Sequence, residues 1–465
     1  MRSQLSSLLA ILALVVLSAS TLASAAPAPK AQDIFPYALK TDRLPNGLTV
    51  VRVKFPSPGL VAYYSVVRTG ARVEVEKDHT GFAHFFEHMM FKGTKKYPEG
   101  EREKVIARFG LDDNAYTTND CTVYHSFGPS KALEALIEVE ADRFANLDYA
   151  EPSFQTEAKA VLGEYHKSAA APELKMEEKL VDTAFTRHTY KHTTLGFYED
   201  IQKMPGYYEY SRQFLKRWYT PDNVVLFVVG DFDDAQALSW IKAKYGPWKG
   251  KVATVSIPPE PPQTSAKAVT LEWATPTLPR QVNAWHTPAA SLKTTDSAVG
   301  QVLGEYLAGS TSPLSKSLIL QNQWAESVLA DNGPTRDPYL FTVWMTLKDA
   351  KHIAPAQAEL DKTVAELLAG KVDKARVEAI KSNVRYSATM SLETANAVGN
   401  NLAYAAGVLG SPDAFIQSLQ AISVVKPEQL VTFAKKYLVP THRTTLTLTS
   451  KTASAAAANP APGAK

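Results

Sequence analysis

The stretch Thr80-Gly-Phe-Ala-His84-Phe-Phe-Glu87-His88-Met-Met-Phe-Lys-Gly-Thr94 constrains the fold of this chain more than any other. Its apolar residues, its Thr-Gly start and its Gly-Thr end predict a buried helix from about residue 80 to about residue 93. Positions four apart lie on one face of a helix, so His84 and His88 present their imidazoles to the same point. The fold must therefore bury this helix while directing both rings to one place.

Two neutral imidazoles at this spacing suit a zinc ion, whose nitrogen ligands lie at about 2.0–2.1 Å. Glu87 sits on the same side and is placed to accept a proton from zinc-bound water, whose pKa the metal lowers to about 7. The pattern H-x-x-E-H is the inverzincin signature, the reverse of H-E-x-x-H. The alternative is that these histidines are ordinary core residues, since the chain contains ten. A third ligand in the right setting would decide between the two.

Length and composition narrow the class of protein. A chain of 465 residues is long for one core, so two or more domains are expected. Its hydrophobic content of 45% and charged content of 21% are those of a soluble globular protein. The net charge of +3 is too small to indicate nucleic acid or a membrane surface as a partner. No basic run and no glycine-rich phosphate loop points to nucleic-acid or nucleotide binding.

Residues 1–25 have the pattern of a secretory signal peptide. Arg2 precedes the apolar run 8–17, and Ala23-Ser24-Ala25 forms an A-x-A cleavage site. We therefore expect a mature chain that begins at Ala26 and is secreted across the inner membrane into the periplasm. A retained membrane anchor is the alternative, but the run is shorter than the roughly 20 residues that span a bilayer. Stable membrane insertion is not expected.

Cys121 is the single cysteine, so an intramolecular disulfide is impossible even in an oxidising compartment. It follows Asn119-Asp120 at the start of a predicted strand. We expect a small, half-buried residue there rather than a metal ligand or nucleophile.

Two carboxylates lie on a second predicted helix, residues 154–167. Glu157 and Glu164 are seven residues apart, which places them two turns apart on one face beside Val161. Buried carboxylates are costly unless they are paired or bound to a metal. Two solvated glutamates on a surface helix are the alternative, which the nearby H-x-x-E-H pattern makes the weaker one.

The order of predicted elements indicates a duplication. Strands at 48–55 and 60–67 precede the metal helix, and 224–229 is a continuous apolar run typical of a central strand. Four prolines in 251–268 predict an extended linker. The second half repeats the strand and helix order, but its corresponding helix, 294–307, has no histidine pair. The predicted class is α+β: two duplicated domains, 26–250 and 269–450, each a mixed or antiparallel sheet packed with long helices. A disordered tail, 451–465, follows.

These motifs together resemble the pitrilysin, insulysin and mitochondrial processing peptidase family of zinc metallopeptidases, and most of all its short two-domain bacterial members. The resemblance extends from about Thr41 to Thr449 and implies half of a clamshell-shaped peptidase. The motifs that carry it are Gly81 to Thr94, Asn114-Ala-Tyr-Thr117, Ala141-Asp142-Arg143, Glu157-x6-Glu164, and Trp218-Tyr219 to Gly230-Asp231.

The resemblance assigns roles to residues of this chain. It implies that His84, His88 and Glu164 bind one Zn²⁺, with water in the fourth position, and that Glu87 is the general base. Glu157 would support a ligand from outside the metal shell. Asn114, Ala115 and Thr117 would line an edge strand to which an extended peptide or unfolded protein adds.

The second half departs from the family pattern. Self-sufficient members carry an Arg and, seven residues later, a Tyr that stabilise the tetrahedral oxyanion. Ile319 and Glu326 occupy those positions here, and no Arg lies between residues 314 and 332. In split members, one subunit has the zinc motif and its partner has the Arg/Tyr pair. We therefore expect a heterodimer with a paralogous subunit, or a homodimer.

Two other functions fit parts of the sequence. The family also contains core subunits that assemble complexes without peptidase activity, although the intact Glu87 argues against this role. A periplasmic solute-binding protein with two lobes and a linker would leave the H-x-x-E-H pattern and Glu164 unexplained.

Overall fold

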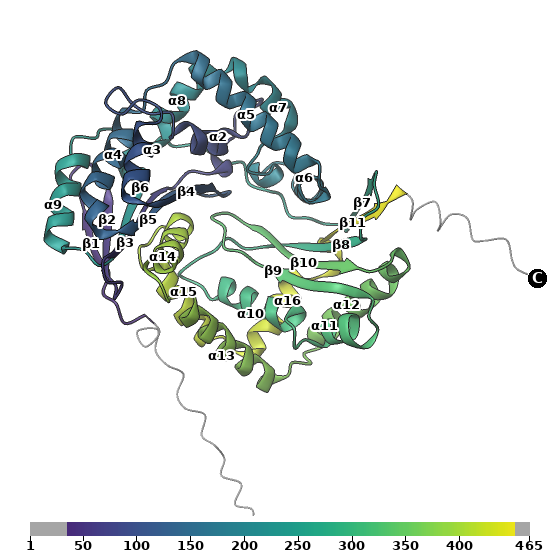
Figure 1. Ribbon diagram of the computed structural model, residues 1–465. Helices are drawn as coiled ribbons and strands as arrows, with labels where there is room; N and C mark the ends of the chain where they lie inside the picture. The colour runs from purple at the N-terminus through teal and green to yellow at the C-terminus, as the bar shows by residue number, and fades with distance from the viewer. Residues whose placement is uncertain (1–34, 452–465) are drawn as a thin grey trace, which may run out of the picture.

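A computed structural model describes residues 35–451, which form two lobes that each contain one β-sheet (Figure 1). The predicted signal peptide, and the predicted tail beyond residue 451, lie outside the described residues. The first sheet has the strand order β1-β2-β6-β3-β5-β4 and the second the order β7-β11-β8-β10-β9. The strands are β1 (Lys40–Arg43), β2 (Thr49–Lys54), β3 (Leu60–Val67), β4 (Asp112–Thr117), β5 (Thr122–Pro129), β6 (Val224–Gly230), β7 (Lys267–Trp273), β8 (Arg280–Thr287), β9 (Ala325–Asp331), β10 (Tyr339–Leu347) and β11 (Arg443–Ser450).

The α-helices connect and cover these strands. They are α2 (Phe82–Met89), α3 (Glu101–Phe109), α4 (Leu133–Asn146), α5 (Glu151–Ala169), α6 (Pro172–Ala184), α7 (Tyr198–Lys203), α8 (Tyr208–Trp218), α9 (Asp234–Tyr245), α10 (Asp296–Ala308), α11 (Pro313–Ser315), α12 (Ile353–Leu368), α13 (Lys374–Met390), α14 (Ala395–Leu409), α15 (Ala414–Ser423) and α16 (Pro427–Tyr437). Single turns are η1 (Ala71–Val73), η2 (Ser130–Ala132), η3 (Thr189–Lys191), η4 (Met204–Gly206), η5 (Pro221–Asn223), η7 (Ala350–His352) and η8 (Pro440–His442), and η6 (Lys316–Gln321) is π-helical.

The two sheets share one pairing plan, and the predicted α+β class is confirmed. The parallel pair β2–β6 corresponds to the parallel pair β7–β11. The antiparallel ladders β6–β3–β5–β4 correspond to β11–β8–β10–β9. By this correspondence, β4 and β9 are equivalent edge strands, α2 is equivalent to α10, and α6 to α14. The domain boundaries predicted from the sequence stay a prediction.

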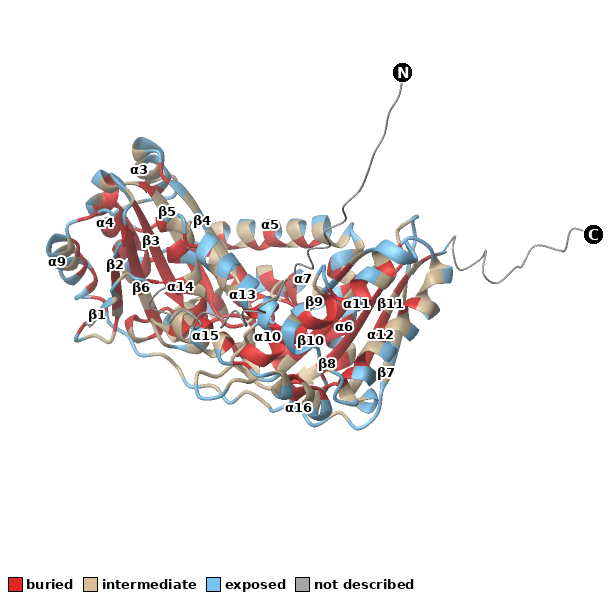
Figure 2. Ribbon diagram, turned by 90° about the horizontal axis from the view of Figure 1, so that it is seen from below, coloured by how far each residue is buried: buried red, intermediate tan, exposed pale blue. Residues whose placement is uncertain are grey.

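Strands at the centre of the first sheet are buried on both faces, as Figure 2 shows for the strands of both lobes. Successive side chains of a strand point to opposite faces. In β3, the Tyr63 hydroxyl bonds the Tyr245 hydroxyl of α9 at 2.8 Å, while the Tyr64 hydroxyl bonds Asn396 Oδ1 of α14 at 2.7 Å. This two-sided burial explains why β3 and β6 are continuous apolar runs in the sequence.

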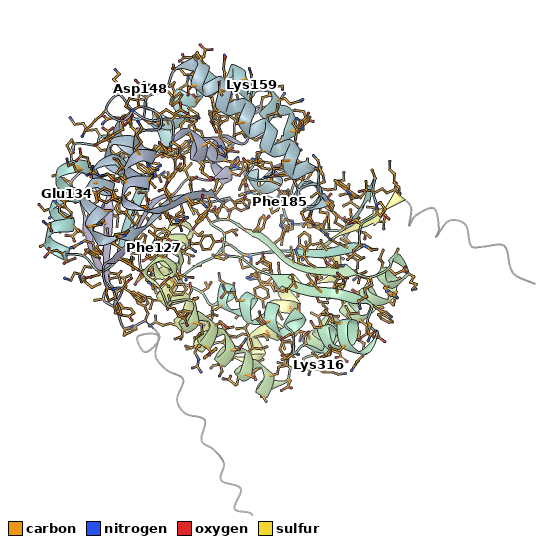
Figure 3. All side chains as sticks on the ribbon, viewed as in Figure 1. Phe127, Glu134, Asp148, Lys159, Phe185 and Lys316 are labelled. Carbon is orange, nitrogen blue, oxygen red and sulfur yellow. The ribbon has the colours of Figure 1, made fainter. Side chains whose placement is uncertain are left out.

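Two helices cross between the halves, and neither is among those predicted from the sequence. Helix α14, from the second half, packs on β3 and β6 of the first sheet, whereas α6, from the first half, packs on β7 and β11 of the second (Figure 1). Phe185, just after α6, lies where the lobes meet and stacks on Tyr339 of β10 with ring centroids 5.6 Å apart (Figure 3). The equivalent helices are therefore exchanged, and each covers the sheet of the other half.

Cys121 lies under α14 and is fully buried, so the expectation of a half-buried residue is wrong. A Cβ added at Gly407 of α14 would meet the Cys121 Sγ at 2.7 Å. The close approach of the exchanged helix therefore encloses this thiol, and burial raises its pKa to about 12.

The predicted linker contains no helix or strand before β7 begins at Lys267, but it is anchored to the protein. Glu260 accepts hydrogen bonds from the backbone N–H groups of Thr186, Arg187 and His188 at 2.8–3.0 Å. The segment after α6 is thereby fixed against the linker. Between residues 35 and 451, no helix has the length and apolar character needed to cross a membrane.

The exchanged helix predicts opposite effects for two Gly→Ala substitutions. A Cβ at Gly399 of α14 would lie 2.4 Å from Cε2 of the buried Tyr64, so Gly399→Ala should destabilise the fold by about 1–3 kcal/mol. A Cβ at the exposed Gly163 of α5 meets nothing within 4 Å, so Gly163→Ala should stabilise by about 0.5–1 kcal/mol. Urea unfolding of the metal-free variants measures both changes. Equal stabilisation by the two would show that α14 does not pack closely on the first sheet.

Candidate metal centre

Helix α2 presents His84 and His88 on one face, as their four-residue spacing predicts. Their ring centroids are 4.8 Å apart, with His84 9% exposed and His88 half-buried. The helix is shorter than predicted because Met90 is its C-cap and the chain then turns to Gly93, which adopts a φ of +89°. The two rings therefore lie on a helix of little more than two turns.

Glu164 of α5 completes a group of three. Its Oε2 atom lies 3.4 Å from His88 Nε2 and 3.8 Å from His84 Nε2. Within residues 35–451, this is the one group of three or more His, Cys, Asp or Glu side chains whose ligand atoms all lie within 4.8 Å. Ligands around a tetrahedral zinc ion are about 3.3–3.6 Å from one another. Two imidazole nitrogens and a carboxylate oxygen at these separations fit such an ion.

Glu157 lies on α5, seven residues before Glu164 and on the same face of the helix. It contacts the His88 ring on the side opposite Glu164. Its Oε1 atom lies 2.9 Å from His88 Nδ1, and its Oε2 atom lies 2.6 Å from Lys92 Nζ. Lys92 also pairs with Glu99 at 2.9 Å. The hydrogen bond with His88, together with Lys92, lowers the pKa of Glu157 to about 2. Lys92 was not predicted as a site residue, although its position four residues after His88 is a usable signal.

The two histidines have opposite electrostatic environments. Burial, with His88 nearby, lowers the pKa of His84 to about 4, so this ring is neutral at pH 7. Its Nδ1 atom is buried without a hydrogen-bond partner among the described residues. Burial acts in the same direction on His88, but the hydrogen bond to Glu157 and the nearby carboxylates of Glu157, Glu164 and Glu87 together outweigh it and raise the pKa of His88. A metal ion would therefore compete with a proton for His88.

Glu87 accepts a hydrogen bond from the Thr117 hydroxyl at 2.6 Å. Burial outweighs this bond and raises the pKa of the Glu87 carboxyl. Thr117 ends β4, which is an edge strand of the first sheet. Asn114 on the same strand is exposed and accepts a hydrogen bond from the N–H of half-buried Ala115 at 2.9 Å. Of these three β4 residues, Thr117 is the one that the structure brings to Glu87.

The first turn of α2 is held by carboxylates that the sequence did not single out. Glu74, whose side chain is fully buried, accepts hydrogen bonds from the N–H groups of Gly81 and Ala83 at 2.7 Å each. Asp200 accepts from the Thr80 hydroxyl at 2.7 Å. The two bonds to Glu74 satisfy backbone N–H groups that have no partner inside the helix. Burial outweighs them at Glu74 and raises its pKa to about 8.

The two positions at which the family resemblance implies an Arg/Tyr pair hold other residues in this structure. Ile319 lies half-buried in η6, and Glu326 is exposed on the edge strand β9.

Comparisons with known proteins agree with the fold. One family model, "Insulinase (Peptidase family M16)", matches residues 60–196, and a second, "Peptidase M16 inactive domain", matches residues 208–384. Zinc protease PqqE of Helicobacter pylori is 27% identical over 421 residues, which are 87% of this chain and 91% of that protein.

Two further relatives support the same assignment. The crystal structure of a protease from Helicobacter pylori superposes with a TM-score of 0.82 at 25% identity, covering 89% of this chain and 99% of the other. The probable β subunit of the mitochondrial processing peptidase of Schizosaccharomyces pombe is 28% identical over 207 residues, 44% of this chain and 45% of that one. The fold is that of the two-domain zinc peptidases. The chain belongs to peptidase family M16, the insulinase family.

The environment of His88 predicts how the metal-free site titrates. A raised pKa means that the folded state holds the proton more tightly than the unfolded chain does. The His88–Glu157 pair should therefore stabilise the metal-free fold fully below about pH 6.5, and this contribution should be lost as the pH rises through the raised pKa. NMR titration should give His88 a pKa above 6.5 in the wild type, lowered in Glu157→Gln. Glu99→Gln, which removes a partner of Lys92 alone, is the matched control. An unchanged pKa in Glu157→Gln would contradict the assignment.

Proposed function

We propose that this chain is a zinc-dependent endopeptidase that hydrolyses extended peptides or small unfolded proteins. The observation that carries the proposal is the convergence of His84, His88 and Glu164, from two helices, beside the carboxylate of Glu87. A purely structural zinc site has no need of a fourth, free carboxylate held by its own hydrogen bond.

Each residue has a defined task in this proposal. His84 Nε2, His88 Nε2 and Glu164 would hold the ion, which when bound supplies a Lewis acid for the carbonyl and for water. Glu157 fixes the His88 ring through Nδ1 so that Nε2 faces Glu164. Glu87 accepts the proton of the attacking water and returns it to the leaving amine. Its raised pKa favours that exchange, because a general base works best near the ambient pH.

The edge strand β4 is the proposed substrate-binding element. Among residues 35–451, no strand pairs with its outer side, so the backbone groups there are available to an added strand. Asn114, Ala115 and Thr117 lie on this strand, and Thr117 also contacts Glu87. A peptide bound there would pass the base in an extended conformation, which selects unfolded segments over folded ones.

We infer that catalysis requires a second subunit that supplies an Arg/Tyr pair. The sequence places Ile319 and Glu326 where that pair is expected, and a carboxylate would oppose an oxyanion. The similarity to a processing-peptidase β subunit supports a heterodimer with a paralogous chain. A homodimer is the alternative arrangement. The signal-like sequence of residues 1–25 supports the periplasm as the location of the proposed activity.

Cleavage of a quenched, unstructured peptide mixture tests the proposal. We expect the chain beginning at Ala26 to bind one zinc, as should Glu87→Gln, since Glu87 is not a proposed ligand. With a paralogous Arg/Tyr subunit present, turnover should fall about 10²–10⁴-fold in Glu87→Gln relative to the wild type. Turnover by the wild-type chain alone would support the peptidase and overturn the need for a partner. A zinc-loaded chain that stays inactive even with a paralogous Arg/Tyr subunit would instead indicate the non-catalytic assembly role.

Thr117 provides a finer test, because it orients the base without touching the metal ligands. Thr117→Val should lower kcat about 10–100-fold, the effect of losing a hydrogen bond to a charged group, while KM and zinc affinity change little. Thr117→Ser keeps the hydroxyl and should retain most of kcat. Equal kcat in the Val and Ser variants would show that this bond does not orient Glu87.

A further inference from the structure

The loop between β9 and β10 reaches from the second half into the first. At its end, Asp337 Oδ2 lies 2.5 Å from Arg72 Nε and 2.9 Å from His188 Nε2. The side chains of Arg72 and Asp337 are 18% and 24% exposed, and that of His188 is 3% exposed. Within residues 35–451, Asp337 is the acidic group that forms an ion pair with Arg72. One carboxylate of the second half therefore anchors two segments of the first.

Arg72 belongs to η1, which leads directly to Glu74. Glu74 follows η1 as its C-cap and accepts the Gly81 and Ala83 N–H groups at the start of α2. Asp337 and the first turn of the metal helix are thus connected through one ion pair, two residues of chain and two hydrogen bonds. The same loop is fixed nearby, because the Arg336 N–H donates to Asp120 Oδ2 at 3.0 Å.

Helix α2 supplies no acidic side chain to its own N-terminus, where Glu74 accepts the backbone N–H groups. Its N-cap, Gly81, has a φ of +86° and no side chain, and no acidic residue lies in its first turn. A helix of eight residues is too short to be stable by itself, so its direction depends on outside contacts. His84 lies three residues after Gly81, and a displaced first turn would move its ring away from Glu164.

Other contacts hold η1 as well. The Arg72 N–H donates to Asn119 O at 2.8 Å, and the Thr189 hydroxyl donates to Arg72 O at 2.7 Å. These bonds fix the backbone of η1 from within the first half. The Arg72 side chain adds the one charge-assisted link from η1 to the other half, and such links are stronger than neutral hydrogen bonds.

We propose that Asp337 is a positioning residue for the metal helix, acting through Arg72 and Glu74 across the junction between the halves. This inference rests on the proposed metal site. In this proposal the second half of the chain, which has no metal ligands, does more than pack against the first. It sets the orientation of α2, and thereby the affinity of His84 and His88 for zinc.

Asp337→Asn tests this role against a matched control, Glu173→Gln. Glu173 of α6 pairs with Arg280 of β8 at 2.5 Å, so the control also removes an ion pair between the halves, but one unconnected to α2. Zinc affinity, measured by competition with a chelator, should fall about 5–10-fold in Asp337→Asn, less than the 10–100-fold typical of direct partners of metal ligands. It should change less than twofold in Glu173→Gln. The visible spectrum of the cobalt-substituted protein should shift in Asp337→Asn alone.

Hydrogen exchange gives a readout without metal. In the metal-free protein, the Gly81 and Ala83 amides should exchange about 5–10-fold faster in Asp337→Asn than in the wild type. Their exchange rates should be unchanged in Glu173→Gln. The double variant Glu74→Gln/Asp337→Asn should bind zinc no more weakly than Glu74→Gln alone, since both act in one relay. If Asp337→Asn fails to fold, Arg72→Lys keeps the charge, removes the guanidinium geometry and makes the same test.

The outcomes separate the two proposals. Wild-type zinc affinity and amide exchange in Asp337→Asn, or additive losses in the double variant, would overturn the positioning role and leave the peptidase proposal intact. Faster amide exchange in a chain that binds no zinc even as wild type would support the relay to α2 and overturn the proposed function.

Discussion

The proposed chemistry depends on holding one short helix in place. Helix α2 carries His84, Glu87 and His88 within eight residues, too few for a helix to be stable alone. Glu74 and Asp200 fix its first turn, and its phenylalanines pack in the core beneath the first sheet. Burial of the ionisable Glu74 carboxyl costs free energy, as its raised pKa shows. The protein nevertheless has this carboxyl at the position where the metal helix begins.

The exchange of α6 and α14 makes the two halves mutually dependent. Each sheet would expose an apolar face if its half were isolated, because the covering helix comes from the other half. Gly399 and Gly407, eight residues apart on α14, lack side chains that would separate the helix from β3. The second half therefore covers the first sheet and places Asp337 beside Arg72, the contact through which we propose that it positions the metal helix.

Much of the fold and the candidate site could be predicted from local patterns. The central strands could be predicted from continuous apolar runs, because both faces of these strands are buried. Strand β3 begins and ends where it was predicted. The repeated order of elements gave the duplication. Spacing of four within α2 and of seven within α5 predicted which side chains share a helix face, and the family resemblance implied that Glu164 joins the two histidines. The exchanged helices α6 and α14 were not predicted from the sequence. For α14 the reason is its two interior glycines, which usually indicate a break rather than a helix.

The sequence by itself thus predicted the fold class from the order of its elements, the peptidase family from a resemblance in several motifs, and the candidate metal-binding side chains from spacing within α2 and α5 together with that resemblance. Tertiary structure alone decided how those side chains are held. Lys92 against Glu157, Thr117 against Glu87, Glu74 against the start of α2, and Asp337 against Arg72 join residues from separate elements. Periodicity carries no information about such pairs, because the distance between two elements is set by how their buried faces pack and not by either element's own sequence.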